Sequence, residues 1–509
     1  MRLAVVTAVV AWAATSACQS LPVTRNIWSR DVDYKALSER LSSSAKIYYP
    51  GSDEFDEASS RWSNLETPTV NIVVVPSTEN DVVETVKFAN KKELPFLAYN
   101  GAHGAITTLG KMTSGIEIYL DQLSGVDIAE DGKTVTIAGG TKSKLVTDTL
   151  WDAGKQTGDD VNAIWLVTGA CECVSYLGPA LGGGHGWLQG RHGLIADQFE
   201  SMNIVLANGT LVTLDPSSEL WWAVKGAGHN FGIVTSVTSK IFDIEHKDWA
   251  IEIITFSGDK VEEIYETINN YLLQNGTQPT DVISWSYWVN DADADANNPV
   301  IQVLIIQEGV TSVDSAYTTP FHSLGPISIE PQNGSYTDLA AWVGITTTSG
   351  PCQKNGAMNP RFPMYLETYN VTAQKKAYEV FAEGVRGSSV FNNSLVTFDG
   401  YSTEGVKSID AGSTAFAFRD ANVLVGPLIE YMPDGADLDE KAAKLGNQIR
   451  QILHEGSGRE HVRAYVNYAY GNEGPEGWYG SESWRQSRLL SLKKKYDPKG
   501  MFSYYAPIA

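Results

Sequence analysis

The chain contains a glycine-rich stretch that reads Gly169-Ala-Cys-Glu-Cys-Val-Ser-Tyr-Leu-Gly-Pro-Ala-Leu-Gly-Gly-Gly-His-Gly186. Its last five residues include four glycines, which cannot form the interior of a stable helix or strand. Hydrophobic side chains crowd these glycines, among them Tyr176, Leu181 and Trp187, which argues against a flexible surface loop. The stretch therefore predicts an unusual backbone path, such as one that wraps a pyrophosphate with its N–H groups.

A second stretch, Asn100-Gly-Ala-His-Gly104, follows a short apolar run at 94–98. Small residues on both sides of His103 allow the backbone to approach a ligand closely. A neutral imidazole is also nucleophilic enough to form a covalent bond to an activated cofactor. The simpler alternative is a turn histidine whose nitrogens are satisfied by hydrogen bonds.

A third stretch covers residues 221–234 and contains Gly226-x-Gly228 and Asn230-Phe-Gly232. It resembles a dinucleotide-binding fingerprint only loosely, because it does not lie at a first strand–helix turn with an acid about 20 residues further on. Trp221 and Trp222 are expected in the core. His185 and His192 lie seven residues apart without other ligands nearby, so no metal site is expected.

Around these stretches the pattern predicts alternating strands and helices. Residues 69–75 read as a buried strand, and Thr78-Glu-Asn-Asp81 has the form of a helix-start capping pattern. Strand-like runs at 116–120 and 134–137 flank an Asp131-Gly132 turn signal, and a hairpin is predicted around Asn208-Gly209. Beyond residue 244, helical windows at 260–273 and 438–454 alternate with a strand at 300–306, which favours helices packed on a sheet.

Composition indicates a globular protein of more than one domain. The 509 residues are 43% hydrophobic and 19% charged, which is enough apolar material for packed cores. A formal charge of −22 argues against nucleic-acid or membrane-surface partners and favours a neutral or cationic small substrate. We expect a monomer.

The N-terminus predicts secretion. Met1-Arg2, an apolar run to Ala14 and the small residues 15–17 read as a signal peptide cut near Ala17. Lipidation of Cys18 in a bacterial lipoprotein is the alternative, although Thr15 stands where an aliphatic residue is preferred. Five sequons are compatible with N-glycosylation; their asparagines are Asn208, Asn275, Asn333, Asn370 and Asn392.

The four cysteines, Cys18, Cys171, Cys173 and Cys352, are too sparse for a disulfide scaffold and badly spaced for zinc. Two thiols one residue apart rarely close on each other. Cys171 and Cys173 are therefore candidates for chemistry.

Taken together and in this order, the motifs resemble the vanillyl-alcohol-oxidase superfamily, and within it the berberine-bridge-enzyme-like oxidases. The matching segments are Gly101-Ala-His103, Gly169-Ala-Cys171, Gly182-Gly-Gly184, Gly226-Ala-Gly-His-Asn-Phe-Gly232, Tyr465-Val-Asn-Tyr468 and Lys494-Lys-Tyr-Asp-Pro498 to Phe502. The resemblance covers roughly residues 60–509. One departure is Tyr99, which stands where the family often has an arginine.

The resemblance implies an α+β fold with two lobes: a PCMH-type FAD-binding domain and a separate α/β substrate domain, whose antiparallel sheet is covered by helices. The expected boundaries are 1–17 for the signal peptide, 60–243 for the FAD-binding domain, 244–464 for the substrate domain and 465–509 for a C-terminal segment that returns to the FAD domain.

The resemblance also implies covalent FAD. His103 would bond the flavin 8α-methyl, and a cysteine would bond C6; counting back from the triple glycine favours Cys171 over Cys173, while single attachment stays possible. Val174 would lie near the flavin C4a, where a small residue admits O2. The other expected cofactor-binding residues are Gly101, Ala102, Gly104, Gly178, Gly182, Gly183, Gly184, Gly232, Ile233, Val234 and Asn467.

The function that follows is an FAD-dependent oxidase. Hydride transfer from a sugar, alcohol or secondary metabolite, with O2 as acceptor and H2O2 as product, needs a base beside the flavin. Tyr468 is the first choice and Tyr465 the alternative, although both are equally compatible with a role in the domain interface. A flavoprotein cyclase without net oxidation and a catalytically silent flavin-binding protein are the rival functions.

Overall fold

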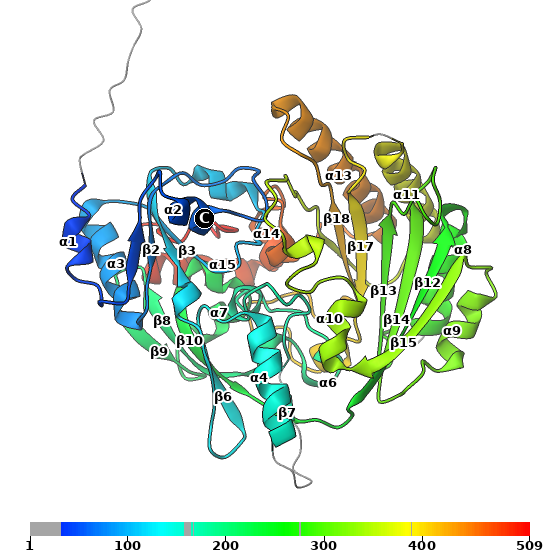
Figure 1. Cartoon of the computed structure of the whole chain (residues 1–509), viewed down its shortest axis with the longest axis horizontal. Coiled ribbons are helices and arrows are strands. Elements are labelled where there is room, and N and C mark those ends of the chain that lie inside the picture. Colours follow the sequence, from blue (N-terminus) through cyan, green and yellow to red (C-terminus); the bar gives the residue numbers. More distant parts are fainter. Residues whose placement is uncertain (1–31, 157–163, 166, 274–275, 388) are drawn as a thin grey trace, which may run out of the picture.

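The computed structural model describes residues 32–156, 164–165, 167–273, 276–387 and 389–509. The signal peptide predicted for residues 1–17 lies outside these ranges, as does the sequon asparagine Asn275. The protein has two domains that lie side by side (Figure 1). The first is built on a four-stranded and a five-stranded sheet, and the second on a seven-stranded sheet. The predicted two-lobed α+β fold is therefore confirmed.

The four-stranded sheet has the order β1-β2-β4-β3. Its strands are β1 (Lys46–Tyr48), β2 (Val70–Val75), β3 (Phe96–Tyr99) and β4 (Gly115–Tyr119). The helix α3 (Glu79–Lys92) connects β2 to β3, as the sequence predicts. Its N-terminus is closed by a capping box, in which the Thr78 hydroxyl accepts from the Asp81 N–H and the Asp81 carboxylate accepts from the Thr78 N–H. The carboxyl end of β3 leads directly into the His103 loop.

The five-stranded sheet is antiparallel, with the order β5-β6-β10-β8-β9. Its strands are β5 (Val126–Ile128), β6 (Thr134–Ala138), β8 (Phe199–Leu206), β9 (Leu211–Leu214) and β10 (Gly232–Lys240). The hairpin around Asn208-Gly209 is confirmed, and Gly209 has the positive φ that its turn requires.

The sequence suggests that the Asp131-Gly132 turn joins the strand-like runs at 116–120 and 134–137. In the structure it joins β5 and β6. β6 pairs with the short strand β5, whereas β4 belongs to the other sheet between two parallel neighbours. The reason is burial: Gly115 to Ile118 of β4 are all buried, and the strand lies in the centre of a sheet, as parallel strands do.

The second domain is an antiparallel sheet with the order β15-β12-β14-β13-β17-β18-β16. Its strands are β12 (Asp248–Ser257), β13 (Val282–Val289), β14 (Val300–Glu308), β15 (Ser328–Ser335), β16 (Met364–Leu366), β17 (Leu395–Gly400) and β18 (Val423–Leu428). Two tryptophans of β13, three positions apart, enter different cores: Trp285 packs toward the first domain, and Trp288 packs under the helices. One face of the sheet therefore meets the first domain.

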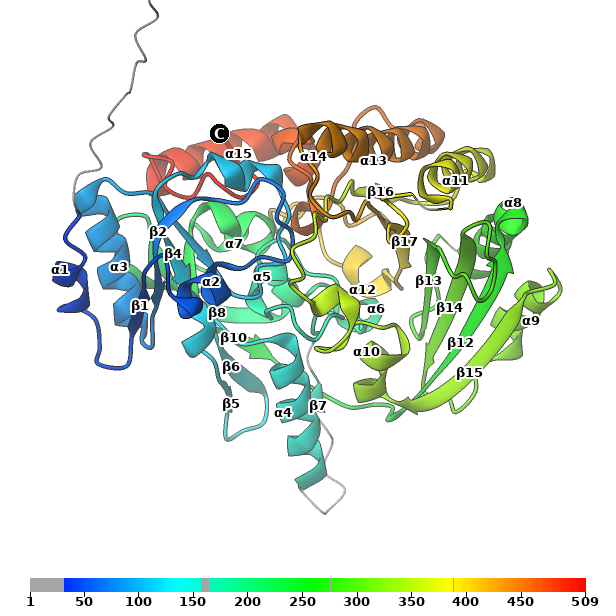
Figure 2. The same cartoon turned by 45° about the horizontal axis from the view of Figure 1, so that its top comes forward.

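Helices cover the other face of this sheet (Figure 2). They are α8 (Val261–Thr267), α9 (Ser315–His322), α11 (Val371–Val385) and α13 (Ala436–Ser457). The shorter helices of the chain are α1 (Lys35–Ser38), α2 (Asp53–Ser59), α5 (Leu177–Ala180), α6 (Gln189–His192), α7 (Trp221–Ala227), α10 (Leu339–Trp342) and α12 (Glu404–Lys407), and α4 (Ser143–Gln156) is a longer one. The strands β7 (Ile164–Trp165) and β11 (Phe242–Asp243) pair with each other.

The C-terminal segment runs back to the first domain as α14 (Gly474–Tyr479) and α15 (Ser483–Tyr496) (Figure 1). Leu489 and Leu492 are buried in a core that also contains strands β6 and β8. The ammonium group of Lys493 is buried and donates to the carbonyl oxygens of Asn230 and Phe502. Within the described ranges, no helix combines the length and the apolar composition that a membrane crossing needs.

Candidate active site

His103 lies in the loop after β3, against a loop of the second domain. Its imidazole stacks on the indole of Trp62, with ring centroids 5.6 Å apart. Nδ1 lies 3.2 Å from the carbonyl oxygen of Gly101, and Nε2 lies 3.2 Å from that of Pro351. Burial lowers the pKa of His103 to about 4, so the ring is neutral at neutral pH. This is the nucleophilic form of a histidine side chain.

The backbone around His103 is tightly surrounded. Ala102 has a φ of 57°, in the left-handed region that favours glycine. A Cβ on Gly101 would lie 3.1 Å from the carbonyl oxygen of Cys173, and a Cβ on Gly104 would lie 2.6 Å from the ring of Tyr505. The two glycines therefore allow this loop to approach the cysteine loop and the C-terminal segment.

The three described cysteines gather beside His103. Cys173 forms a disulfide with Cys352 of the second domain, and Cys171 is a free thiol. The Cys171 sulfur lies 3.6 Å from each of the other two sulfurs, and the Cys173 sulfur lies 3.5 Å from His103 Nε2. Burial raises the pKa of Cys171. The disulfide leaves Cys171 as the thiol available for other chemistry, and a disulfide sulfur is not a thiolate metal ligand.

Tyr99 replaces the arginine that the family often has, but a guanidinium is still present beside it. Arg61 lies 5.2 Å from the centroid of the Tyr99 ring and forms a buried ion pair with Glu117. Tyr99 also stacks on Tyr119 at 4.9 Å. The positive charge next to this strand therefore comes from another segment of the chain.

The triple glycine forms a sharp backbone turn against the segment 465–468. Gly183 and Gly184 have φ values of 101° and 84°. A Cβ on Gly182 would lie 2.5 Å from the side-chain oxygen of Asn467, whose amide nitrogen donates to the carbonyl oxygen of Pro179 at 2.8 Å. The unusual path predicted from the sequence is confirmed, and Asn467 supports it.

The remaining predicted cofactor-binding residues lie in the surrounding framework. The carbonyl oxygen of Val174 accepts from Ser143 N–H at 2.9 Å, and that of Gly178 lies 3.1 Å from a ring nitrogen of His229. Gly232, Ile233 and Val234 form the start of β10, where a Cβ on Gly232 would collide with β8. Ile233 and Val234 are core residues of two different clusters.

Tyr468 and Tyr465 face a carboxyl group from the second domain. Asp399, on β17, is buried, and its pKa is raised to about 7 by burial, against the opposing effects of Arg361 and of a hydrogen bond from Tyr468. Burial also raises the pKa of Tyr468 far above its usual value, and that of Tyr465 to about 12. Both phenols are thus protonated at neutral pH, and Asp399 is the group that titrates there.

His185 lies in a chain of hydrogen bonds next to this pair. Nδ1 lies 2.8 Å from the side-chain oxygen of Gln189, and Nε2 lies 2.8 Å from the hydroxyl of Tyr365. Since the Gln189 oxygen can only accept, Nδ1 carries the proton and Tyr365 donates to Nε2. Burial lowers the pKa of His185 to about 4, so this histidine stays neutral.

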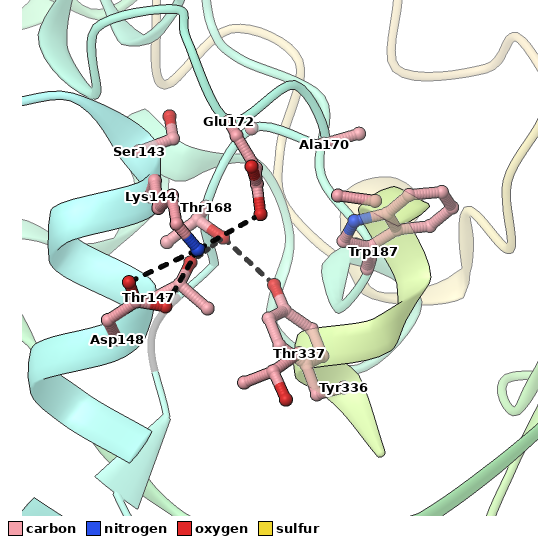
Figure 3. Close-up of a pocket in the computed structure, with 12 residues that line it drawn as sticks. Ser143, Lys144, Thr147, Asp148, Thr168, Ala170, Glu172, Trp187, Tyr336 and Thr337 are labelled. Carbon is pink, nitrogen blue, oxygen red and sulfur yellow. Dashed lines mark hydrogen bonds and ion pairs between the residues drawn. The ribbon is translucent and has the colours of Figure 1, made fainter. Parts of the chain in front are cut away.

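Behind the cysteine loop lies a polar pocket between α4 and α10 (Figure 3). The ammonium group of Lys144 lies 3.2 Å from carboxylate oxygens of both Glu172 and Asp148. Glu172 in turn accepts from the backbone N–H of Thr347 in the second domain. These contacts hold the loop of Cys171 in place from its far side.

Two functional candidates are absent from the sequence motifs. Asp399 is the only acidic residue in β17, an otherwise largely apolar strand, and such a charge in a buried strand is a signal that a reader of the sequence can find. Arg361 precedes β16 in an irregular segment and has no comparable signal. Both come close to Tyr468 only because the second domain folds against the first.

The loops fit a flavin nucleotide. The side-chain oxygens of Asn100 and Ser143 are buried without a partner among the described residues. Asn100 precedes Gly101, and Ser143 is bonded through its backbone to Val174. Unpaired buried oxygens beside glycine turns are typical of loops that hold a polar ligand. A neutral imidazole and a free thiol lie at the same place.

Fold and site together define a two-domain flavin-dependent oxidoreductase. Family models match as "FAD binding domain" over residues 70–215 and "Berberine and berberine like" over residues 464–509. The FAD-linked oxidoreductase chyH of Penicillium rubens is 77% identical over 509 residues, which cover 100% of both chains. The chain belongs to the berberine-bridge-enzyme-like family of FAD-linked oxidoreductases.

Solved structures share the fold. The xylooligosaccharide oxidase from Myceliophthora thermophila, in complex with xylobiose, superposes with a TM-score of 0.77 over 93% of this chain and 98% of that one, at 20% identity. The glucooligosaccharide oxidase from Acremonium strictum, described with a 6-S-cysteinyl, 8α-N1-histidyl FAD, has a TM-score of 0.76 over the same shares of the two chains, at 15% identity.

Proposed function

We propose that this protein is a secreted, monomeric FAD-dependent oxidase that acts on an alcohol, sugar or secondary metabolite, with O2 as acceptor and H2O2 as product. Its FAD is held covalently by His103 and Cys171. The observation that carries the proposal is that the neutral imidazole of His103 and the free thiol of Cys171 both lie against the Cys173 sulfur, at 3.5 Å and 3.6 Å.

Attachment at Cys171 rather than Cys173 is supported by the disulfide, because Cys173 is already bonded to Cys352. Two-site attachment is also what the name of the glucooligosaccharide oxidase describes for that protein. Val174 adjoins the cysteine loop and presents a small side chain, which favours access of O2.

When bound, FAD supplies a two-electron acceptor for a hydride from the substrate carbon. The chain's own residues handle the proton. Tyr468 is protonated and lies close enough to Asp399 to influence the pKa of that carboxyl group, so it can accept a substrate hydroxyl proton while its own proton passes to the carboxylate. The proton then rests on Asp399, whose pKa of about 7 suits this exchange. The hydroxyl of Tyr465 accepts a hydrogen bond from the backbone N–H of His185, which fixes the position of Tyr465 next to Tyr468.

The test of covalent attachment is mass mapping of the purified holoprotein. After acid denaturation, we expect flavin absorbance to stay with the polypeptide and the FAD mass to appear on peptides containing His103 and Cys171. His103→Ala should lose the histidyl bond, whereas His246→Ala, at an exposed position, should not. Free FAD in the supernatant of the denatured wild type would contradict the proposal.

Oxidase activity is tested with a panel of alcohols, sugars and aromatic metabolites. Substrate-dependent H2O2, with a product two mass units lighter, is expected; a product of unchanged mass would favour a cyclase instead.

Cleavage near Ala17 and loss of mass on deglycosylation of the exported protein would support secretion. Four sequon asparagines, Asn208, Asn333, Asn370 and Asn392, are exposed. Light scattering of the purified protein measures its molar mass in solution, and the mass of a single chain is expected.

A further inference from the structure

Arg361 enters the candidate site from the second domain, in the segment before β16, which is tied to β18 by a bridge to Leu428. Its guanidinium carbon lies 4.6 Å from the ring centroid of Trp62 and 4.3 Å from that of Tyr468. Trp62 belongs to the first domain and Tyr468 to the C-terminal segment. Two aromatic rings from different parts of the chain therefore hold this cation by cation–π contacts.

No described residue forms a hydrogen bond or an ion pair with the Arg361 side chain. The buried arginines of the described chain are all paired: Arg61 with Glu117, Arg419 with Asp197, Arg450 with Glu473 and Arg485 with Glu482. A guanidinium has five N–H donors, and leaving them without acceptors in a half-buried place is unfavourable. The donors of Arg361 are thus available to a ligand.

The charge of Arg361 acts on the centre of the proposed active site. Burial raises the pKa of Cys171, Asp399 and Tyr468, and the Arg361 charge opposes that rise; burial lowers the pKa of His103, and the same charge adds to that fall. Asp399 feels this charge but forms no ion pair with Arg361, so it does not saturate these donors. A substrate that lies beside Tyr468 and Asp399 would lie beside Arg361 as well.

We propose that Arg361 anchors the substrate by binding a carbonyl or carboxylate oxygen. The two rings cover the guanidinium, and the donors in its plane match planar oxygen acceptors better than they match the tetrahedral hydroxyls of a neutral sugar. The inference rests on the proposed function, since it places the substrate at the same site. It predicts an acidic or amide-bearing metabolite, although the net charge of the whole chain is −22.

Binding of small aromatic probes to the purified holoprotein tests this directly. Benzoate and benzamide carry the two acceptor types, and benzyl alcohol carries only a hydroxyl; binding is read from the difference spectrum of the bound flavin at pH 6. We expect benzoate or benzamide to bind about tenfold or more tightly than benzyl alcohol, because a hydrogen bond to a charged group contributes that much. Arg361→Gln should abolish the preference, and Arg463→Gln, at a paired surface arginine, should keep it.

Several results would overturn the inference: no probe binds, all three bind equally, or Arg361→Gln keeps the preference. If Arg361→Gln does not fold, Arg361→Lys decides, because an ammonium group keeps the charge but not the planar fork. Benzamide affinity should then fall about tenfold, and an unchanged affinity would contradict the role. Probe binding needs no turnover, so it stands apart from the H2O2 and mass-mapping tests of the proposed function.

Discussion

Asp399 places a carboxyl group on the strand β17, where burial raises its pKa to about 7. Sequence motifs alone point to a tyrosine as the base. The structure shows that Tyr468 and Tyr465 keep their protons at neutral pH, because burial raises the pKa of both phenols. We therefore propose that the proton acceptor is a tyrosine–aspartate pair whose charge resides on Asp399.

This pair predicts the pH dependence of the reaction. The carboxylate must be ionised to accept the proton, so kcat/KM should rise with pH and level off above about 7. Asp399→Asn should lower kcat/KM by roughly 10²–10⁴-fold and remove this limb of the profile. Asp420→Asn, at an exposed aspartate, is the control. A profile of Asp399→Asn that keeps the limb would assign the titration to another group.

Asp399 should also make the stability of the protein depend on pH, with a fall in the free energy of unfolding where kcat/KM rises. Its folded-state pKa lies above its ordinary value, so the folded state holds a proton that the unfolded state releases. The free energy of unfolding should consequently fall as pH rises from about 4 to 7. Asp399→Asn should flatten this fall, which denaturant unfolding at pH 5 and pH 8 measures. A variant with the same pH dependence as the wild type would contradict it.

Gly182 offers a test of the glycine turn. A Cβ there would meet Asn467 and Val466, both at 2.5 Å, so Gly182→Ala should cost about 1–3 kcal/mol and release flavin more readily. Gly125→Ala is a matched control, since nothing lies within 4 Å of a Cβ at that position. Thermal unfolding and flavin content measure both variants. Equal stability of the two would argue against the close approach of 465–468 to the turn.

Among the elements, α3 shows how a local motif determines structure. The Asp81 carboxylate accepts hydrogen bonds from the N–H groups of Ser77 and Thr78 and also from Ser42, and these bonds lower its pKa. Asp81→Ala should destabilise the protein by about 1–3 kcal/mol, because several N–H groups lose their acceptor. Lys91→Ala, at an exposed position of the same helix, should change stability by less than about 0.5 kcal/mol.

The Asp81 prediction is checked by urea unfolding at pH 7, where the carboxylate is ionised. Because the folded-state pKa of Asp81 is lowered, its contribution should persist above about pH 4 and be lost as the pH falls below it. The difference between wild type and Asp81→Ala should therefore shrink in acid. A constant difference would show that packing, not the carboxylate charge, stabilises this helix start.

For the whole molecule, the disulfide between Cys173 and Cys352 joins the two domains beside the proposed flavin site. It spans 179 residues, so Cys352→Ser should cost several kcal/mol, about 3–5 by the loop-closure argument. Cys171→Ser keeps the disulfide and serves as the matched control: its stability should change little, while the cysteinyl flavin bond is lost. Thermal unfolding and peptide mapping give the two readouts.

Peptide mapping of Cys352→Ser asks a further question, because this variant frees Cys173 next to Cys171. If flavin then appears on Cys173, the disulfide is what directs attachment to Cys171. If Cys352→Ser is as stable as the wild type, the disulfide does not hold the domains together.

Features that depend on local backbone conformation and local residue pattern could be predicted from the amino-acid sequence. Positive φ values are accessible almost only to glycine, so the turn at Gly182–Gly184 was readable, as were the capping box at Thr78 and the hairpin at Gly209. The helix windows beyond residue 244 likewise became α8 and α13. The family and its two-lobed fold followed from such motifs in their order along the chain.

Contacts between residues that are distant in sequence could not be predicted in this way, because they depend on how the two domains pack. β6, which follows the Asp131-Gly132 turn, pairs with β5 and not with β4, because β4 is buried in the centre of the other sheet. Cys352, Asp399 and Arg361 come from the second domain, and their neighbours in the site are far away in sequence. Residue spacing along the chain does not specify what packs around a side chain. That packing determines which cysteines pair, how burial shifts the pKa of a carboxyl group, and whether an arginine keeps free donors.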